Sequence, residues 1–219
     1  MKPYGEIFTN FYNLGPTYTD AGHTEICTGF KQEINNTGGE LPNYPGIFQY
    51  YLAATKKDST KAWVITSKDK LAILANCKQA EWHNKFMPAT DCGINGIGTG
   101  YRDDSTTFRK VMSVLKTYHP NLMIVNFKQP DAAGHQNNWQ AFIDGIRATD
   151  NYAYQIWSFL QTDPNYKNTT TFIYTNDHGR HCDGWQDGFV NHGDTCHCCR
   201  HINLFMSGPD FKKNEIVSG

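Results

Sequence analysis

The sequence has no long hydrophobic run, no excess of positive charge and no internal repeat. Its 219 residues contain no apolar stretch of about 18 residues, the shortest that predicts a membrane-spanning helix. The first residues also lack the apolar segment of a signal peptide. The net charge of −1 provides no basic surface for a nucleic-acid backbone. Since 39% of the residues are hydrophobic and 14% are aromatic, we expect a folded chain of one domain.

The seven cysteines are unevenly placed, and three of them fall in the sequence CHCC at 196–199. This density favours an oxidising compartment, so we expect an extracytoplasmic protein, periplasmic or secreted. Adjacent Cys198 and Cys199 cannot bridge each other without strain. Zinc is an alternative for CHCC, but the sequence lacks the second pair of ligands that a structural zinc site normally shows. Disulfides or an unpaired thiol are therefore favoured over zinc there, and the pairing of Cys182, Cys196, Cys198 and Cys199 stays open.

Short apolar segments alternate with amphipathic ones along the chain. The apolar segments are rich in β-branched residues and are typical of strands buried in a parallel sheet. The amphipathic segments have apolar residues at helical spacing. This alternation predicts an α/β layered domain. The expected strands are 62–66, 121–127 and 171–175, and the expected helices are 105–118 and 138–160.

Two glycine-rich or proline-rich segments are expected to be irregular. Residues 31–45 predict a loop, and so do residues 91–104, which contain the fragment GIGTG. A nucleotide-binding loop is an alternative for this fragment. The glycine spacing fits neither a Rossmann turn nor a P-loop, and no strand is expected before it, so we favour a flexible connection. We therefore expect one domain over residues 1–219 with loop-rich insertions at about 31–45 and 78–104.

Aspartate and histidine residues gather after two of the expected strands. Asp131 and His135 follow the second strand, Asp177 and His178 follow the third, and His192 comes further on. Ligands of open α/β sheets bind beyond the carboxyl ends of the strands. Asp and His together suit a borderline divalent ion such as zinc. Although a single Asp-His pair is usually a solvated turn, two such pairs after two strands favour a metal site that could hold two ions.

The segment 15–29, GPTYTDAGHTEICTG, predicts a helix that begins near Thr19 and ends at Gly29. Thr19 would cap this helix, and helix N-termini bind anions. A threonine hydroxyl is a weak nucleophile unless a base or a metal activates it. Taken alone, Thr19 is more readily interpreted as a simple helix cap.

Four motifs in order resemble the alkaline phosphatase superfamily, and the resemblance covers residues 15–209. PTYTDAGHTEICTG resembles the nucleophile segment of its type I phosphodiesterase/nucleotide pyrophosphatase branch and of threonine-nucleophile alkaline phosphatases. PDAAGH at 130–135, TNDHGRH at 175–181 and HGDTC at 192–196 resemble its metal-ligand motifs. The resemblance implies an alkaline-phosphatase-like layered α/β/α domain with a mostly parallel sheet. Sulfatases of the superfamily are disfavoured, since their nucleophile lies in a C-x-P-x-R context.

Carried over by position, the motifs imply a nucleophile and two metal sites. Thr19 matches the metal-bound nucleophile. The implied ligands of one ion are Asp131, His135 and His192, and those of the other are Asp177, His178 and Thr19. The implied reaction is hydrolysis of phosphate monoesters or diesters through a phospho-threonine. Two divalent ions would hold the phosphoryl group between them, and zinc is favoured over manganese. Arg180 and His181 would support the ligands or contact phosphate, and His192 is preferred over His197 and His201 because a glycine follows it.

One departure from the family pattern concerns the second ion. Family members carry a further Asp ligand at the end of a first strand, and no Asp precedes Thr19 in this sequence. We therefore expect this strand to be missing, the domain to be truncated at both ends, and the second metal site to be weak. The alternative function is a catalytically impaired metal-binding domain of the same fold. The expected partner is a small phosphate ester, and Asn36, Lys68 and Lys70 are polar candidates for its phosphate contacts.

Overall fold

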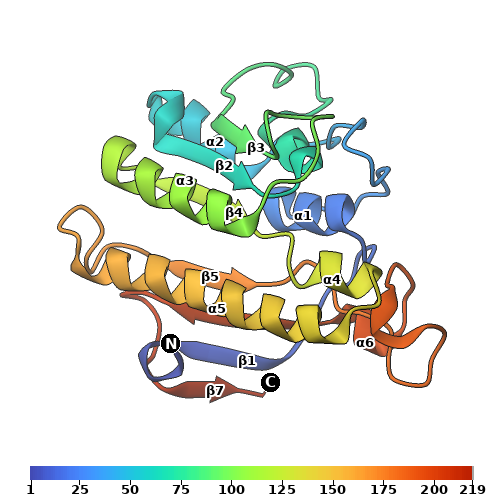
Figure 1. Ribbon diagram of the computed structural model, residues 1–219. Coiled ribbons are helices and arrows are strands. Elements are labelled where there is room, and N and C mark those ends of the chain that lie inside the picture. Colours follow the sequence, from blue (N-terminus) through green and yellow to red (C-terminus); the bar gives the residue numbers. More distant parts are fainter. Residues whose placement is uncertain (219) are drawn as a thin grey trace. The chain divides into compact units, whose positions relative to one another are not determined.

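The structure is a computed structural model that describes residues 1–218 (Figure 1). Contacts divide the chain into two compact units. Unit 1 comprises Met1–Thr17 and Pro130–Gly219, and unit 2 comprises Tyr18–Gln129. The α/β class is confirmed, since helices and a sheet occur in each unit. No helix within residues 1–218 is both long and apolar enough to cross a bilayer. The single domain over the whole chain stays a prediction.

Unit 2 is built on a three-stranded parallel sheet of order β3-β2-β4. β2 (Ala62–Thr66) is the central strand, and Val64 lies opposite Thr90 of β3 and Ile124 of β4. Parallel neighbours need long crossover connections, and α3 supplies the one from β3 to β4. The other elements of unit 2 are α1 (Thr19–Thr28), α2 (Ile47–Thr55), η2 (Ser59–Lys61), η3 (Asp69–Ala75), β3 (Ala89–Cys92), α3 (Asp104–Tyr118) and β4 (Leu122–Asn126).

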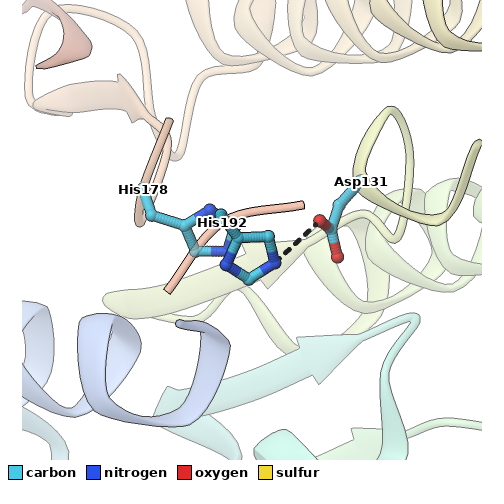
Figure 2. A group of neighbouring side chains, drawn as sticks. All are labelled: Asp131, His178 and His192. Carbon is cyan, nitrogen blue, oxygen red and sulfur yellow. Dashed lines mark ion pairs between the residues drawn. The ribbon is translucent and has the colours of Figure 1, made fainter. Parts of the chain in front are cut away.

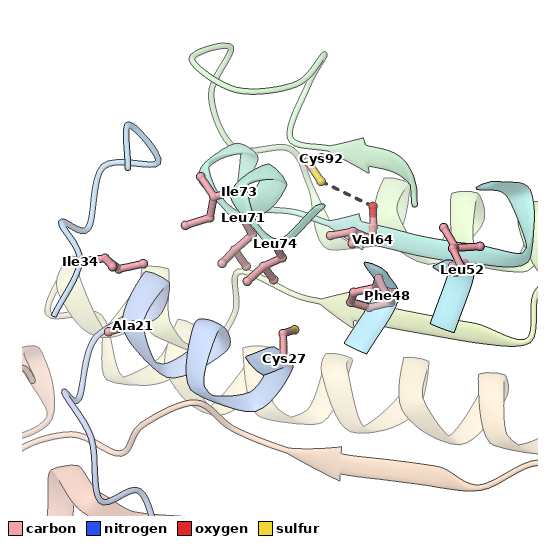
Figure 3. Packing of buried hydrophobic residues seen from close by; sticks show 11 residues of the cluster. Ala21, Cys27, Ile34, Phe48, Leu52, Val64, Leu71, Ile73, Leu74 and Cys92 are labelled. Carbon is pink, nitrogen blue, oxygen red and sulfur yellow. Dashed lines mark hydrogen bonds between the residues drawn. The ribbon is translucent and has the colours of Figure 1, made fainter. Parts of the chain in front are cut away.

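The core of unit 2 lies where α1 and α2 pack with β2 and η3 (Figure 3). Phe48, Val64 and Leu71 are completely buried there. Burial of each such side chain stabilises the fold by about 1.5–3 kcal/mol. This core holds the chain that follows β2, from Ser67 to Asp69, and the start of α1 in fixed positions, and both segments carry polar side chains of the candidate site.

Unit 1 contains a four-stranded mixed sheet of order β5-β6-β1-β7. β6 is antiparallel to both of its neighbours, whereas β1 and β7 are parallel. The long helix α5 lies along this sheet (Figure 1), and the Trp157 indole of α5 donates to Ser207 Oγ of β6 at 3.4 Å. The elements of unit 1 are η1 (Lys2–Tyr4), β1 (Glu6–Tyr12), α4 (Asp131–His135), α5 (Trp139–Thr162), β5 (Phe172–Thr175), η4 (Gly188–Val190), α6 (His197–Arg200), β6 (His201–Ser207) and β7 (Glu215–Val217).

The predicted helices 105–118 and 138–160 correspond to α3 and α5, and the three predicted strands correspond to β2, β4 and β5. The parallel interpretation is wrong for the third strand, because β5 pairs with β6 in the antiparallel direction. Its side chains are accordingly half-buried or exposed rather than buried on both faces. The expectation that no strand precedes the GIGTG segment is also wrong, since β3 ends at Cys92, directly before Gly93.

The expected absence of a strand before Thr19 is wrong as well. β1 spans Glu6–Tyr12 and lies inside the sheet of unit 1 between β6 and β7. The residue after β1 is Asn13, which is buried. A strand therefore occupies the expected place in the chain, and it ends at an amide rather than at a carboxylate.

Candidate metal centre and nucleophile

Helix α4 of unit 1 presents two candidate ligands on one face. Asp131 is its first residue and His135 its last, and residues four apart in a helix are neighbours on its surface. His135 Nε2 lies 3.3 Å from Asp131 Oδ1. The motif glycine between them has a packing role, since a Cβ at Gly134 would lie 2.6 Å from the Arg180 guanidinium carbon.

His192 joins these two residues from the segment between η4 and α6. Its Nε2 lies 3.3 Å from Asp131 Oδ1 and 3.1 Å from His135 Nε2. The three ligand atoms thus form a nearly equilateral triangle. Ligands about 2.0–2.1 Å from a tetrahedral zinc ion lie about 3.3–3.4 Å from one another, so the triangle matches one face of such a site.

Hydrogen bonds on the far side of each ring define which nitrogen faces this triangle. His192 Nδ1 donates to the Thr17 carbonyl at 2.7 Å, and His135 Nδ1 donates to Asn191 Oδ1 at 3.0 Å. The Asn191 amide is itself oriented, because its Nδ2 donates to Asp187 at 2.6 Å. Both Nε2 atoms of neutral rings therefore carry lone pairs that face each other and the Asp131 carboxylate. Three acceptors at this distance repel one another unless a cation or a proton lies between them, so the residues fit a divalent metal ion.

Asp177 and His178 follow β5 and lie beside this triangle. His178 Nε2 is 3.4 Å from Asp177 Oδ2, and the His178 ring stacks on His192 with ring centroids 3.7 Å apart (Figure 2). His178 Nδ1 donates to the Gly179 carbonyl at 2.8 Å, which leaves Nε2 as the lone-pair atom. Burial lowers the pKa of His178 to about 4, so the ring is neutral and able to bind a metal. The buried Nε2 has no hydrogen-bond partner among residues 1–218.

A second grouping includes His178, since ligand atoms of Asp131, His178 and His192 all lie within 4.8 Å of one another. The structure thus brings together five of the six predicted metal ligands within unit 1. Thr19, the sixth, belongs to unit 2.

Arg180 fixes the carboxylate of Asp131. Its guanidinium donates to Asp131 Oδ1 and also to the carbonyls of Phe189 and Val190, which precede His192. The other histidines lie elsewhere in unit 1: His197 contacts the Tyr12 hydroxyl, His201 the Thr9 carbonyl, and His181 the Asp187 carboxylate.

Thr19 of unit 2 is the first residue of α1, which ends at Gly29 in the left-handed conformation as expected. The predicted helix cap is wrong, because the cap position is Tyr18 and no side chain caps the helix. Thr19 is buried, and its Oγ1 accepts a hydrogen bond from Lys68 Nζ at 3.0 Å. Its hydroxyl oxygen is therefore paired with an ammonium group, which favours negative charge on that oxygen.

The other polar candidates also gather at the start of α1. Asn36 Oδ1 accepts from the Asp20 backbone N–H at 3.0 Å and from Lys70 Nζ at 2.6 Å. Lys70 Nζ lies 3.4 Å from Asp20 Oδ1, and both side chains are buried. Lys70 thus neutralises a buried carboxylate, whereas Lys68 is directed at the Thr19 hydroxyl.

Asn13, which directly follows β1, forms hydrogen bonds with backbone groups, including that of the candidate ligand Asp177. Its Nδ2 donates to the Asp177 carbonyl at 2.7 Å and to the Pro16 carbonyl at 3.3 Å, and its Oδ1 accepts from the Gly15 N–H. Sequence reasoning missed Asn13, whereas Lys68 and Arg180 were among its polar candidates. For Lys68 a signal existed, since it follows the predicted strand 62–66 by two residues, where side chains at a strand end meet ligands.

Comparison with known proteins agrees with this architecture. Residues 16–218 match the family described as the metalloenzyme superfamily. The chain belongs to the metalloenzyme superfamily. This confirms the resemblance to alkaline-phosphatase-like proteins, and the superfamily's fold accounts for nearly the whole chain.

The individual relatives are distant in sequence from this chain. A 2,3-bisphosphoglycerate-independent phosphoglycerate mutase of Roseobacter denitrificans is 24% identical over 196 residues, which are 88% of this chain and 36% of the mutase. The crystal structure of Ps i-CgsB is similar with a TM-score of 0.58 and 13% identity, over 99% of this chain and 61% of that one. The alkaline phosphatase of the Antarctic bacterium TAB5 has a TM-score of 0.52 and 13% identity, over 98% and 84%. The chain thus spans about a third of its curated relative.

Proposed function

We propose that this metalloenzyme hydrolyses phosphate monoesters or diesters through a phospho-threonine formed on Thr19. The observation that carries the proposal is the triangle of Asp131 Oδ1, His135 Nε2 and His192 Nε2, because its spacing matches three ligands of a tetrahedral metal ion. Family membership supports a metal-dependent enzyme. The names of the mutase and of the TAB5 alkaline phosphatase support phosphoryl chemistry.

Zinc is the metal we propose for the triangle, with manganese as the alternative. Two imidazole nitrogens and one carboxylate oxygen suit a borderline ion, and their spacing suits tetrahedral ligation. Asp177 and His178 would hold a second, weaker ion, since Asn13 provides no carboxylate after β1. A divalent ion, when bound, supplies Lewis acidity that stabilises negative charge on phosphoryl and ester oxygens.

Side chains of the protein itself have the remaining roles in the proposed reaction. Thr19 Oγ1 forms a bond to phosphorus while the bond from phosphorus to the leaving ester oxygen breaks, and that oxygen takes a proton. The Lys68 ammonium, 3.0 Å from Thr19 Oγ1, stabilises the oxygen as it loses its proton and then attracts the phosphoryl oxygens. Water next cleaves the phospho-threonine, which releases phosphate and restores the hydroxyl. Arg180 holds Asp131, and Asn13 holds the backbone of Asp177.

A second candidate function is a metal-binding domain that has lost catalysis. The amide of Asn13 favours it, because an amide at the end of β1 binds a second ion more weakly than a carboxylate would. For the location we propose an extracytoplasmic compartment, which the Cys182–Cys198 disulfide supports. A small phosphate ester is the proposed partner.

The experiment compares hydrolysis of p-nitrophenyl phosphate, its bis ester and its sulfate by the wild-type protein and by Thr19→Ala, Thr19→Ser and Asp131→Asn. We expect turnover of a phosphate ester but not of the sulfate, and a phosphate adduct on Thr19 detectable by mass spectrometry. Thr19→Ala should lose turnover and keep its metal, Thr19→Ser should retain part of the turnover, and Asp131→Asn should lose both metal and turnover. Full activity of Thr19→Ala would contradict the mechanism. Metal binding without turnover of any ester would favour the second candidate function.

A further inference from the structure

A second cluster of metal-binding side chains lies in unit 1, apart from the residues used above. Its members are His181, Asp194 and Cys199, and one ligand atom from each lies within 4.8 Å of the other two. Cys199 is completely buried and His181 nearly so, whereas Asp194 is half-buried. These atoms offer a nitrogen, an oxygen and a sulfur to a common point.

Cys196 provides a fourth candidate ligand. It caps the short helix α6, and its Sγ accepts the Cys199 N–H at 3.3 Å, so the two thiols face the same side of the C-x-x-C turn. The side chains of Cys196 and Cys199 both contact the Asp194 carboxylate. Metal binds the thiolate form of cysteine, so metal binding at this turn would release the thiol protons.

The orientation of His181 also favours a cation at this point. Its Nδ1 donates to Asp187 Oδ1 at 2.7 Å, so in the neutral ring Nε2 carries the lone pair. This Nε2 faces Asp194 Oδ2 at 3.6 Å, close to the separation of about 3.3–3.4 Å between two nitrogen or oxygen ligands of tetrahedral zinc. A carboxylate on the outer nitrogen of a metal-binding histidine is the usual arrangement in zinc sites.

We propose that His181, Asp194, Cys196 and Cys199 form a structural zinc site. Two thiolates, one imidazole and one carboxylate complete a four-coordinate set of the kind that selects zinc over magnesium or calcium. The sequence alone favoured disulfides or an unpaired thiol at CHCC, because the partner ligands His181 and Asp194 are not arranged as a recognisable motif. In the structure Cys198 pairs with Cys182, which leaves Cys196 and Cys199 as thiols.

The site has a structural consequence for the candidate metal centre. It ties residue 181 to residues 194–199, and His192 lies between these two anchors. The Cys182–Cys198 disulfide closes the same segment next to both anchors. Together the zinc and the disulfide would restrict the motion of the loop that contains His192.

Cobalt titration distinguishes this site from the triangle of Asp131, His135 and His192, which contains no sulfur. The full chain is stripped of metal with a chelator under conditions that preserve the disulfide, and Co²⁺ is then added. We expect a near-ultraviolet sulfur-to-cobalt charge-transfer band that saturates at one equivalent of sulfur-bound cobalt and disappears when Zn²⁺ is added. Cys196→Ser and Cys199→Ser should each remove roughly half of this band, since each removes one of two thiolates.

Matched controls separate this proposal from the proposed function. Cys77→Ala, which alters a buried thiol of unit 2, should leave the band intact, and so should Asp131→Asn. A wild-type protein with reduced Cys196 and Cys199 that gives no charge-transfer band would overturn the site. A native Cys196–Cys199 disulfide, found by mapping of alkylated peptides from the untreated protein, would overturn it too. Either result leaves the hydrolase assay and the Asp131 ligand set unaffected.

Discussion

Replacement of Lys70 by methionine should leave a carboxylate buried without its counter-charge. Asp20 is fully buried, the Lys70 side chain is only 8% exposed, and Lys70 Nζ lies 3.4 Å from Asp20 Oδ1. Methionine keeps the length and most of the apolar stem of lysine, so the main change is loss of the ammonium group. Removal of one partner from a buried ion pair costs about 3–5 kcal/mol, and we expect the free energy of unfolding to fall by that amount.

The loss of stability in Lys70→Met should depend on pH, because Asp20 titrates. Burial raises the pKa of Asp20, and the Lys70 ammonium opposes this effect, so Lys70→Met should raise the pKa of Asp20 further. An aspartate whose pKa is higher in the folded state than in the unfolded state binds protons more readily when folded. The folded state is then penalised increasingly as pH rises from the unfolded pKa to the folded pKa. The decrease in the free energy of unfolding caused by Lys70→Met should accordingly be smaller at about pH 5 than at about pH 8.

Urea denaturation of the metal-free protein at both pH values measures these effects. A loss of about 3–5 kcal/mol corresponds to a decrease in Tm of roughly 6–20 °C for a chain of this size. The double variant Asp20→Asn/Lys70→Met should recover much of the loss. Lys78→Met is the matched control, because Lys78 and its partner Glu40 are both partly exposed and solvent screens their interaction, so stability should change little. Unchanged stability of Lys70→Met, or no recovery in the double variant, would refute the reasoning.

Three further substitutions test the candidate site. Lys68→Met should lower kcat/KM for a phosphate ester by roughly 10–100-fold, since the charged hydrogen bond to Thr19 is lost; a kcat/KM equal to that of wild type would contradict this role. Asn13→Asp should destabilise the metal-free protein by about 1–3 kcal/mol, measured by urea denaturation, because a carboxylate cannot donate to the Asp177 carbonyl. Gly134→Ala should weaken retention of zinc against a chelator, because the new Cβ displaces the Arg180 side chain that holds Asp131; zinc retention equal to that of wild type would contradict this packing.

Periodic burial made part of the fold predictable from the sequence. The apolar stripe of α5 includes Ala153, Ile156, Trp157 and Leu160, and all four are buried. β1 was missed because it follows no such pattern: polar Thr9 and Asn10 interrupt it, its register shifts between Phe8 and Phe11, and none of its side chains is fully buried. β3 was missed because it has only four residues, and Thr90 and Asp91 at its centre are polar.

The candidate metal centre was predictable where spacing in the sequence fixes spacing in the molecule. Asp131 and His135 are four residues apart on a single helix, so their convergence follows from helical geometry. Lys68 and Thr19 are 49 residues apart, and their hydrogen bond depends on how η3 and α1 pack around a shared core. The set of His181, Asp194 and Cys199 was hidden for the same reason, because His181 and Asp194 lie in irregular segments and meet Cys199 of α6 only through packing.

The role of Asn13 bears on how tightly each of the two proposed metal sites binds its ion. Its amide donates to two carbonyls, Asp177 among them, and accepts from Gly15, so every polar atom of the side chain already positions backbone. A carboxylate at this position would gain a charge for metal binding but would lose both donated hydrogen bonds. The residue after β1 therefore orients Asp177 instead of adding a ligand beside it. Since each set has one carboxylate but the Asp131 set has two histidines and the Asp177 set one, the Asp131 set should bind zinc more tightly than the Asp177 set.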